Sequence, residues 1–499
     1  MLPFIATLPI LFTLIALIGL RKPAAYVAPL GWILSAFLAW AFWKATPVSI
    51  AVVSLSGVVW AGLVFVWGVF GAFFFLNFLR LAGILDRITA TISAIIDDRA
   101  MKAVLVMFSF GMFLGAVAPA GSSFVVAGSM LLGEGIPLSA IAAMGMFGNG
   151  PQSPYGLLGV PVDALAHTTG LPKEPLSVSI ALLFSFFVAI APLWMVLFLG
   201  SERWRRMLLP TLIVGGVYGL VQCLTVWLVG VELANMAAGL GAIGATVALA
   251  RRQHHPLSRA SSPQRDLGYL VPFLVLIVLV LITRLVSPLK TALTTHPLAV
   301  EIWFRAEEGI TEKVKFSYLY SPGTMAIASV FISIVILRLR LSILVPIFRQ
   351  TLRQVLLMAV AVSSFAAMAH VMKDFGMNIA LAQAMVDIAG RSFPLVSPLV
   401  GMLGTAITGS TTASNIFFGG FQMEVAQRLG LSGVAVGASQ VVGCTAGEII
   451  CPLNALVITS GLGMKGEEGA VMRRMVPSTI LYAGLTMVAS FLFISYLAK

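Results

Sequence analysis

Charged residues are scarce in this chain of 499 residues. Asp, Glu, Lys and Arg make up 10% of it, hydrophobic residues make up 59%, and the mean hydropathy is +1.01. This composition leaves no room for a sizeable water-soluble domain. The apolar runs are too long and too continuous for the alternating strands of a transmembrane barrel. Since about twenty apolar residues cross a bilayer as a helix, we predict an all-α polytopic membrane protein.

Metal-ligand clusters and enzyme motifs are also lacking. The three cysteines, Cys223, Cys444 and Cys451, lie in apolar surroundings without metal-ligand spacing, and we interpret them as buried thiols. The sequence contains no GxxxxGK[ST] loop, no HExxH pair and no GxSxG turn. These absences argue against an enzyme, and neither a metal nor an organic cofactor is expected.

The basic residues, which give a formal net charge of +12, cluster in short loops between the apolar runs. In a soluble protein this excess would suggest a nucleic-acid partner, but in a membrane protein it marks the cytoplasmic loops. We therefore expect no nucleic acid and predict a multi-pass protein in the plasma (inner) membrane of a prokaryote. All basic clusters face the cytoplasm in one consistent trace if both termini are extracytoplasmic.

Twelve membrane crossings follow from this trace. They are predicted at residues 3–20, 24–43, 50–79, 138–160, 176–199, 207–229, 233–250, 268–286, 322–337, 354–372, 432–461 and 475–497. Two further apolar segments, 103–133 and 393–430, fit helical hairpins that enter and leave the membrane on one side. The external segment 287–321 is expected to form a short interfacial helix.

Each predicted hairpin is interrupted near its middle by small and polar residues, APAGSS at 118–123 and TGSTTASN at 408–415. Non-helical backbone at membrane depth is tolerated only where protein or a water-filled cavity satisfies its polar groups. Paired interruptions in two halves of a chain indicate the binding site of a transporter. The crossing after each hairpin is also broken, by Pro151 and Pro154 in the first half and by Pro452 in the second, where Asn454 would satisfy freed backbone or contact the solute.

The two halves share one register. Gly83 and Leu138 correspond to Gly376 and Leu431 at a constant offset of 293 residues. This predicts a duplication, although similar composition of two glycine-rich halves is an alternative. The first repeat would cover 1–200, linking helices and a cytoplasmic loop 201–267, and the second repeat 268–499. Because seven crossings precede the second repeat, the repeats are predicted to be inverted.

The candidate substrate-binding residues lie at the hairpin tips and helix breaks. Helix starts carry unpaired N–H groups and positive partial charge, so they attract anions without a lysine. Ser, Thr and Asn are also ordinary helix caps, and capping is the alternative interpretation. The candidates are Ser122, Ser123, Asn149, Gln152, Ser153, Ser410, Thr412, Ser414, Asn415 and Thr445.

Glu448 is the acidic residue inside a predicted broken helix, and we take it as the ion-coupling residue. An ionised carboxylate at membrane depth costs at least ~3 kcal/mol on insertion scales, so it should either titrate or pair with a cation. A salt bridge in a cytoplasm-facing cavity is the alternative. Two other groups, Asp163 with His167 and His370 with Lys373 and Asp374, are interpreted as surface residues in preference to a proton relay.

Several segments resemble the lactate permease family of 2-hydroxy-monocarboxylate transporters. These are GMFLGAVAPAGSSFVVAG (111–128), NGPQSPYGLLGVPVDAL (149–165), LGTAITGSTTASNIFF (403–418) and VVGCTAGEIICP (441–452). The resemblance implies proton-coupled uptake of lactate or glycolate, inverted repeats with re-entrant hairpins, elevator-type movement and a homodimer. The family usually has an acidic residue where this chain has Gly115, another at Thr411, and a lysine at Glu448.

Together these observations predict a symporter for a small organic anion, with H⁺ as the coupling ion. A Na⁺-coupled carrier of dicarboxylates or sugar acids is the alternative, because hairpin-tip SN segments in related transporters coordinate Na⁺. A passive anion channel is a further alternative. The expected partners are the small organic anion, the lipid bilayer and a second copy of the chain.

Overall fold

The structure of the chain is a computed structural model. It describes residues 2–20, 22–93, 95–96, 98–118, 121–200, 204–252, 267–305 and 311–497. Pro119 and Ala120 of the first interruption, and residues 253–266 of the predicted cytoplasmic loop, lie outside the described residues.

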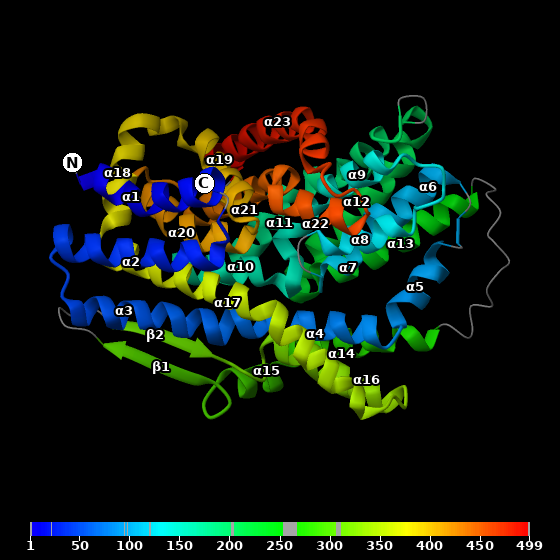
Figure 1. Cartoon of the computed structure of the whole chain (residues 1–499), viewed down its shortest axis with the longest axis horizontal. Helices are drawn as coiled ribbons and strands as arrows, with labels where there is room; N and C mark the ends of the chain where they lie inside the picture. The colour runs from blue at the N-terminus through cyan, green and yellow to red at the C-terminus, as the bar shows by residue number, and fades with distance from the viewer. Residues whose placement is uncertain are drawn as a thin grey trace.

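Helices make up most of the structure (Figure 1). In the first half they are α1 (Leu2–Leu14), α2 (Ala24–Trp43), α3 (Pro47–Trp60), α4 (Trp67–Leu81), α5 (Ile84–Ser93), α6 (Arg99–Ala103), α7 (Gly111–Gly115), α8 (Ser122–Ser129), α9 (Leu138–Gln152), α10 (Gly156–Thr169), α11 (Lys173–Leu197), α12 (Trp204–Leu228) and α13 (Ala234–Arg252). In the second half they are α14 (Val271–Leu285), α15 (Ser287–Thr294), α16 (Pro322–Ile336), α17 (Leu344–Asp374), α18 (Met377–Ala389), α19 (Phe393–Thr408), α20 (Thr411–Arg428), α21 (Gly433–Ile450), α22 (Pro452–Gly461) and α23 (Glu468–Leu492). Short 3₁₀ and π segments join several of these helices.

Ten helical segments of the described chain are long and apolar enough to cross a membrane. They are Ala24–Trp43, Pro47–Leu81, Lys173–Leu197, Trp204–Leu228, Val231–Arg252, Gly268–Leu285, Leu341–Asp374, Met377–Thr408, Gly433–Ile450 and Glu468–Tyr496. The shorter apolar helices α1 and α16 lie at two other predicted crossings. The predicted multi-pass helical class is confirmed, and the number of twelve crossings stays a prediction.

The segment 287–321 departs from the all-α prediction. Among the described residues of this segment α15 is the only helix, and it is followed by the strands β1 (Val300–Arg305) and β2 (Thr311–Phe316), which pair antiparallel with Val300 opposite Phe316. In VEIWFR, Ile302 and Phe304 are half-buried while the residues between and beside them are exposed, the period of two that a half-buried strand shows. Val314 is buried against the same apolar cluster as Val53 of α3. The expected interfacial helix was therefore wrong for most of this segment.

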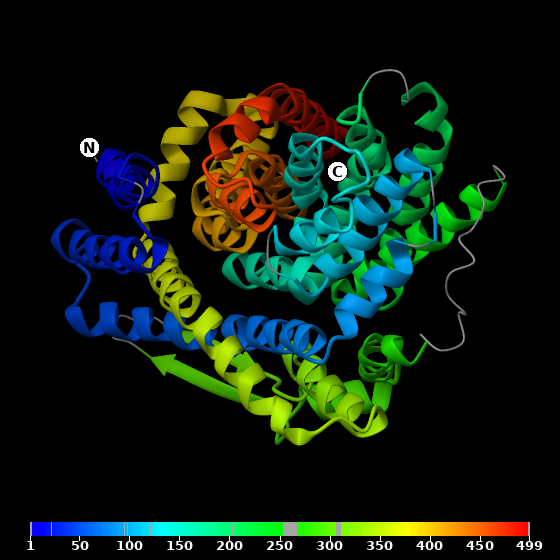
Figure 2. The same ribbon diagram turned by 45° about the vertical axis from the view of Figure 1, so that its right-hand side comes forward.

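The helices form an inner bundle and an outer layer. The inner bundle contains α19 to α23 together with α9, α10 and α11, while α2, α3, α4, α16 and α17 pack on one another as the outer layer. Figure 2 shows the blue and yellow-green helices of this layer curving around the orange, red and cyan bundle. Helix α17 also contacts α20, so it joins the layer to the bundle.

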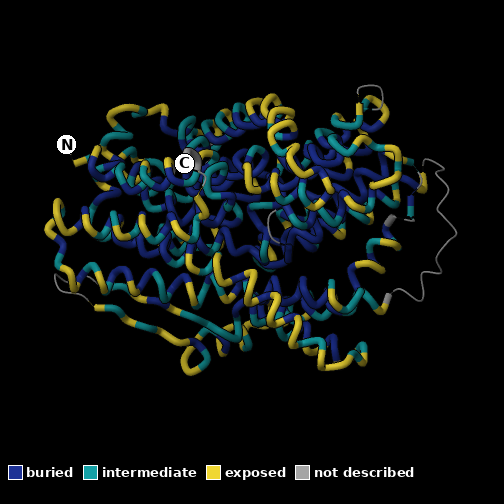
Figure 3. Tube along the Cα trace, in the orientation of Figure 1, coloured by how far each residue is buried: buried dark blue, intermediate teal, exposed yellow. Residues whose placement is uncertain are grey.

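Buried residues concentrate in the interior, and exposed residues lie at the periphery, on the outer layer and also on α12 and α23 (Figure 3). Many exposed side chains are large and apolar, such as Val335 (73% exposed), Trp227 (68%) and Ile480 (67%). In water such a surface would aggregate, but lipid tails solvate it. The exposed apolar surface is therefore the lipid-facing surface of a membrane protein.

Glycines allow α19 and α21 to pack in close contact. Gly443 and Gly447 are four residues apart on α21, a spacing that lets membrane helices approach closely. A Cβ on Gly443 would lie 1.9 Å from the carbonyl oxygen of Pro398 in α19, and a Cβ on Gly447 would lie 2.3 Å from that of Met402. These glycines therefore hold α19 against the helix that carries Glu448.

We expect Gly443→Ala to lower thermal stability and the yield of folded protein. Its added methyl group would collide with backbone, and overpacking of this kind typically costs about 1–3 kcal/mol. Gly484→Ala in α23 is the matched control, since no atom of the described residues outside the adjacent helix backbone lies within 4 Å of the added Cβ. Melting temperatures of the purified variants in detergent test this expectation. Equal melting temperatures for the two variants would contradict the close packing.

Candidate functional site

A cavity of about 420 Å³, here called the central cavity, lies where the inner bundle meets the outer layer. Its polar side chains all come from the bundle and are those of Asn149, Gln152, Ser153, Thr408, Ser410, Thr411, Thr412, Glu448 and Asn454, beside apolar residues such as Leu157, Pro161, Leu453 and Val457. Its outer-layer side is apolar and comprises Ala24, Ala25, Phe73, Leu357, Met358, Ala361, Val362 and Phe365. The cavity is therefore large enough for a small solute, and the polar groups that could orient it all come from the bundle.

Helices α7–α8 and α19–α20, which flank the two interruptions, are here called the first and second helix pairs. The turn between α19 and α20, the tip of the second pair, forms one edge of this cavity. Helix α19 ends at Gly409, which adopts the left-handed conformation (φ 72°) that favours glycine. The Ser410 hydroxyl then caps α20 by accepting a hydrogen bond from the Ala413 N–H at 3.3 Å. The interruption seen in the sequence is thus a tight turn between two helices, with the start of α20 facing the cavity.

Glu448 lies at this helix start and accepts four hydrogen bonds. Its Oε1 accepts from the Thr411 backbone N–H at 3.1 Å and from the Thr411 hydroxyl at 2.9 Å. Its Oε2 accepts from the Nδ2 groups of Asn149 at 2.9 Å and Asn454 at 2.6 Å. The Glu448 carboxylate therefore occupies the anion position that the sequence predicts at the start of α20.

Asn149 connects the two interrupted segments. Its Oδ1 accepts a hydrogen bond from the Gly121 N–H at 2.8 Å, while its Nδ2 donates to Glu448. Gly121 precedes α8 in the left-handed region (φ 78°), at the first interruption. One amide side chain thus links the tip of the first helix pair, through Glu448, to the tip of the second.

The segment that follows each interrupted helix pair is broken beside the cavity. This segment is α9–α10 in the first half and α21–α22 in the second. Leu157 (φ 49°), Leu158 (φ 59°) and Gly159 (φ 82°) are left-handed, and regular helix in α10 resumes after them. Two consecutive leucines in this conformation are strained, a feature that concentrates at functional sites. In the second half Cys451 is extended before Pro452, and the freed carbonyl of Glu448 accepts a hydrogen bond from Asn454 at 3.1 Å.

The central cavity contains a buried acid without a basic partner. Glu448 is 2% exposed, and none of the described residues that line the cavity is Lys, Arg or His. The positive end of α20 and the three hydrogen-bonding side chains support its negative charge. A second anion entering this cavity would meet Glu448 without an intervening cation.

The predicted site residues fall into two groups. Asn149, Gln152, Ser153, Ser410, Thr412 and Glu448 line the central cavity. The others do not line it, and three of these form contacts behind the cavity wall. Ser123 donates to the Gln152 Oε1 at 2.6 Å, Ser414 to the Gly401 carbonyl at 3.1 Å, and Asn415 to the Pro161 carbonyl at 2.9 Å. Thr445 lies 3.0 Å from the Tyr482 hydroxyl, and Ser122 is half-buried at the start of α8.

Of the two other Glu448 partners, Thr411 was absent from the predicted set, whereas Asn454 was predicted to satisfy freed backbone or to contact the solute. Asn454 takes the first of these roles, because its Nδ2 donates to the Glu448 carbonyl that Pro452 leaves without a helical partner. Thr411 was predicted only to be a position at which this chain departs from the family, which usually has an acidic residue there. The apolar residues of α17 that line the cavity could not be predicted from the sequence, because the sequence of α17 resembles that of any lipid-facing helix.

His370 was predicted on the surface, and this prediction was wrong. It is 5% exposed, its Nδ1 lies 3.1 Å from the Ser56 hydroxyl, and its ring centroid is 5.8 Å from that of His167. His167 in turn stacks on Trp60 with ring centroids 4.1 Å apart. The two histidines, 203 residues apart in the sequence, meet because α10 and α17 both lie beside α3.

Comparisons with known proteins give one family. The sequence matches the family model described as L-lactate permease over residues 3–498. It is 24% identical to the L-lactate permease of Bacillus subtilis over 98% of this chain and 95% of that protein. It is 25% identical to the glycolate permease GlcA of Escherichia coli over 96% and 93%. The solved YdaH transporter of Alcanivorax borkumensis aligns with 87% of this chain and 86% of its own at 15% identity, with a TM-score of 0.46.

Proposed function

The chain belongs to the L-lactate permease family, and from this premise we propose that it carries a 2-hydroxy monocarboxylate such as lactate or glycolate across the membrane together with a proton. The names of its relatives, L-lactate permease and glycolate permease, support this substrate class. The observation that carries the proton-coupled mechanism is Glu448, a buried acid in a cavity without a basic residue.

The central cavity suits a small anion with a hydroxyl group. Hydrogen-bond donors at the start of α20 and on Asn149 and Asn454 converge on one carboxylate position, now held by Glu448. The side chains of Gln152, Ser153 and Thr412 lie on the same wall and can contact a neighbouring hydroxyl. The apolar wall fits the short carbon chain of a monocarboxylate.

Charge repulsion explains why a proton would accompany the substrate. An ionised Glu448 and a bound carboxylate in one low-dielectric cavity repel each other strongly. Protonation of Glu448 removes this repulsion and releases donors for the substrate. Substrate binding therefore favours the protonated acid, and by linkage the protonated acid favours substrate binding.

Asn454 offers a partner for the protonated acid. Its Nδ2 donates to Glu448, whereas its Oδ1 is buried without a hydrogen-bond partner in the described chain. Rotation of the amide would place Oδ1 toward Glu448, where it can accept a hydrogen bond from the carboxyl O–H. The shell around Glu448 can thus satisfy both protonation states.

The division of the cavity also supports elevator-type movement of the bundle. The polar side chains of the cavity belong to the bundle, and the apolar wall opposite them belongs to α2, α4 and α17 of the outer layer. An apolar wall makes no directional bonds, so a bundle with its solute could slide along it. We propose that the pairs α7–α8 and α19–α20 are the re-entrant hairpins of two inverted repeats that move in this way in a homodimer.

Uptake by purified protein in proteoliposomes tests this function. L-lactate, D-lactate, glycolate, a dicarboxylate and a sugar acid are offered in turn, with a proton gradient and a sodium gradient imposed separately. We expect 2-hydroxy monocarboxylates to accumulate only with the proton gradient. Accumulation of another solute class, or accumulation driven by sodium alone, would contradict the proposal. Protein-free liposomes are the control for passive leak.

A further inference from the structure

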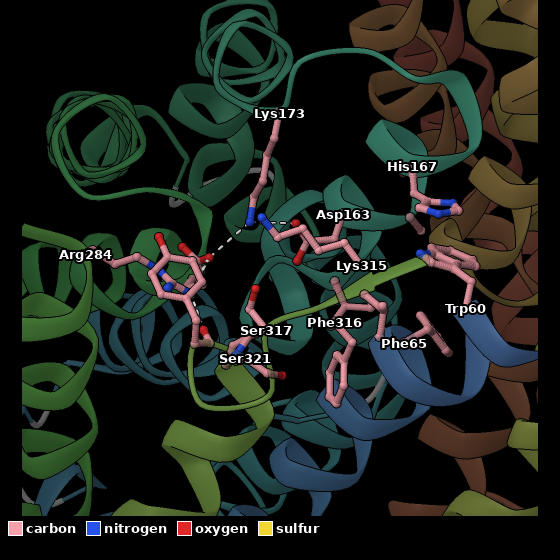
Figure 4. Close-up of a pocket in the computed structure, with 16 residues that line it drawn as sticks. Trp60, Phe65, Asp163, His167, Lys173, Arg284, Lys315, Phe316, Ser317 and Ser321 are labelled. Atoms are coloured by element: carbon pink, nitrogen blue, oxygen red, sulfur yellow. Dashed lines mark hydrogen bonds and ion pairs between the residues drawn. The ribbon is translucent and has the colours of Figure 1, made fainter. Parts of the chain in front are cut away.

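A second cavity, of about 220 Å³ and here called the charged cavity, adjoins the central cavity. Five charged side chains line it, and Figure 4 shows Arg284 and Lys173 on one side and Trp60, Phe65 and Phe316 on the other. It lies between α10, the start of α11, α14 and the chain from β2 to α16. No part of the mechanism proposed above uses these groups.

Four of the five charges form an ion-pair chain. Lys173 Nζ lies 2.6 Å from Asp163 Oδ1 and 3.1 Å from Glu232 Oε1, as the dashed lines in Figure 4 mark. Arg284 Nη2 lies 3.0 Å from the same Glu232 oxygen. The charges of Asp163 and Glu232 thus balance those of Lys173 and Arg284. Lys315 on β2 is the fifth charge, so the lining of the cavity has a net charge of +1 when His167 is counted as neutral.

Arg284 has unused donors in this cavity. The residue is 8% exposed, its Nη2 donates to Glu232 and to the Tyr320 carbonyl, and its guanidinium lies 3.4 Å from the centre of the Tyr320 ring. Its Nε and Nη1 are buried and have no hydrogen-bond partner among the described residues. The guanidinium carbon lies over the Tyr320 ring, and this contact uses neither Nε nor Nη1 as a hydrogen-bond donor.

The two cavities share one helix. Val160 of α10 lines the charged cavity, and the next residue, Pro161, lines the central cavity. The Asn415 side chain of α20 donates a hydrogen bond to the Pro161 carbonyl, so this part of α10 is bonded to the second helix pair. A solute released from one cavity is therefore separated from the other by the thickness of α10.

We propose that the charged cavity is a second carboxylate site, in which Arg284 and Lys315 capture the substrate anion before it reaches Glu448. One monocarboxylate balances the excess positive charge and supplies acceptors for the free N–H groups of Arg284. Exposed Lys315 attracts the anion from solution and raises the encounter rate. This inference rests on the proposed function, since it assigns a second position to the same substrate.

Charge changes at Lys315 test the site without disturbing the core, because this side chain is exposed on β2. We expect KM for L-lactate to rise in the order wild type, Lys315→Gln, Lys315→Glu, with kcat unchanged and a total change of about tenfold. Lys315→Arg restores the wild-type KM. Arg284→Lys, which keeps the charge but loses the planar fork, also raises KM. Initial rates of both uptake and efflux are measured. The rise in KM is expected for transport that starts on the side of the membrane to which the charged cavity opens.

Lys313→Gln is the matched control, because Lys313 is on the same strand but pairs with Glu301 and does not line the cavity. Its KM is expected to stay at the wild-type value. Wild-type KM in both directions for Lys315→Gln, Lys315→Glu and Arg284→Lys would overturn the second site and leave the proposed function intact. A wild-type protein that does not transport L-lactate or glycolate would overturn the proposed function, and this site with it.

Discussion

Glu448→Gln is expected to abolish uphill transport while leaving exchange intact. Glutamine resembles the protonated acid in size and shape but cannot release a proton, so binding and movement continue without coupling. Wild-type vesicles with an electroneutral one-to-one symporter should accumulate L-lactate about tenfold for each unit of pH gradient. In the variant we expect no accumulation, although counterflow of labelled lactate against unlabelled lactate persists. Both rates are measured in the same vesicles.

Glu424→Gln is the matched control for this variant. Glu424 is on α20, in the same helix pair, but it forms a partly exposed ion pair with Arg428 at 3.0 Å away from the cavity. It should accumulate lactate as the wild type does. If Glu448→Gln still concentrates lactate on a proton gradient at the wild-type rate, Glu448 does not carry the coupling proton.

An exchange of charges at Thr411 and Glu448 is expected to show strong non-additivity. Thr411→Asp places a second carboxylate against Glu448, and Glu448→Lys buries an ammonium without an acid beside it. An uncompensated buried charge typically costs about 3–5 kcal/mol. The double variant pairs the two charges, in the arrangement that the family resemblance implies. We expect both single variants to lose lactate transport and folded yield, and the double variant to recover a substantial part of each.

A double-mutant cycle on melting temperature and uptake rate measures this coupling. The pair Thr412→Asp with Glu448→Lys is the control, because Thr412 lines the cavity but makes no hydrogen bond with Glu448 in the structure. It should not recover function. Additive effects of Thr411→Asp and Glu448→Lys would show that the contact between these two positions is unimportant.

The helix breaks and the buried acid could be predicted from the sequence because their signals are local. Pro452 ends α21 wherever the chain is placed, and Gly409 followed by Ser410 supplies a left-handed turn and a helix cap within two residues. Glu448 stands out because acids are rare in apolar segments. These features depend on backbone chemistry over a few residues, which a single sequence records.

Contacts between distant segments could not be predicted in this way. Thr411 and Glu448 are 37 residues apart, and Asn149 and Glu448 are 299 residues apart, so their hydrogen bonds depend on how the helices pack. The burial of His370 depends on α10, which lies about two hundred residues earlier in the chain. The strands β1 and β2 were missed because the charges in this segment were interpreted as an interfacial helix and the β-branched and aromatic residues of VEIWFR were overlooked.

The central claim is that substrate binding loads a proton onto Glu448, and proton uptake on binding tests it most directly. Purified protein in weakly buffered solution is mixed with L-lactate, and a pH indicator reports the protons taken up per lactate bound. The pH is chosen so that Glu448 is ionised before lactate is added. The account predicts uptake of one proton by the wild type and none by Glu448→Gln. Equal proton uptake by the two proteins, or none by the wild type, would contradict it.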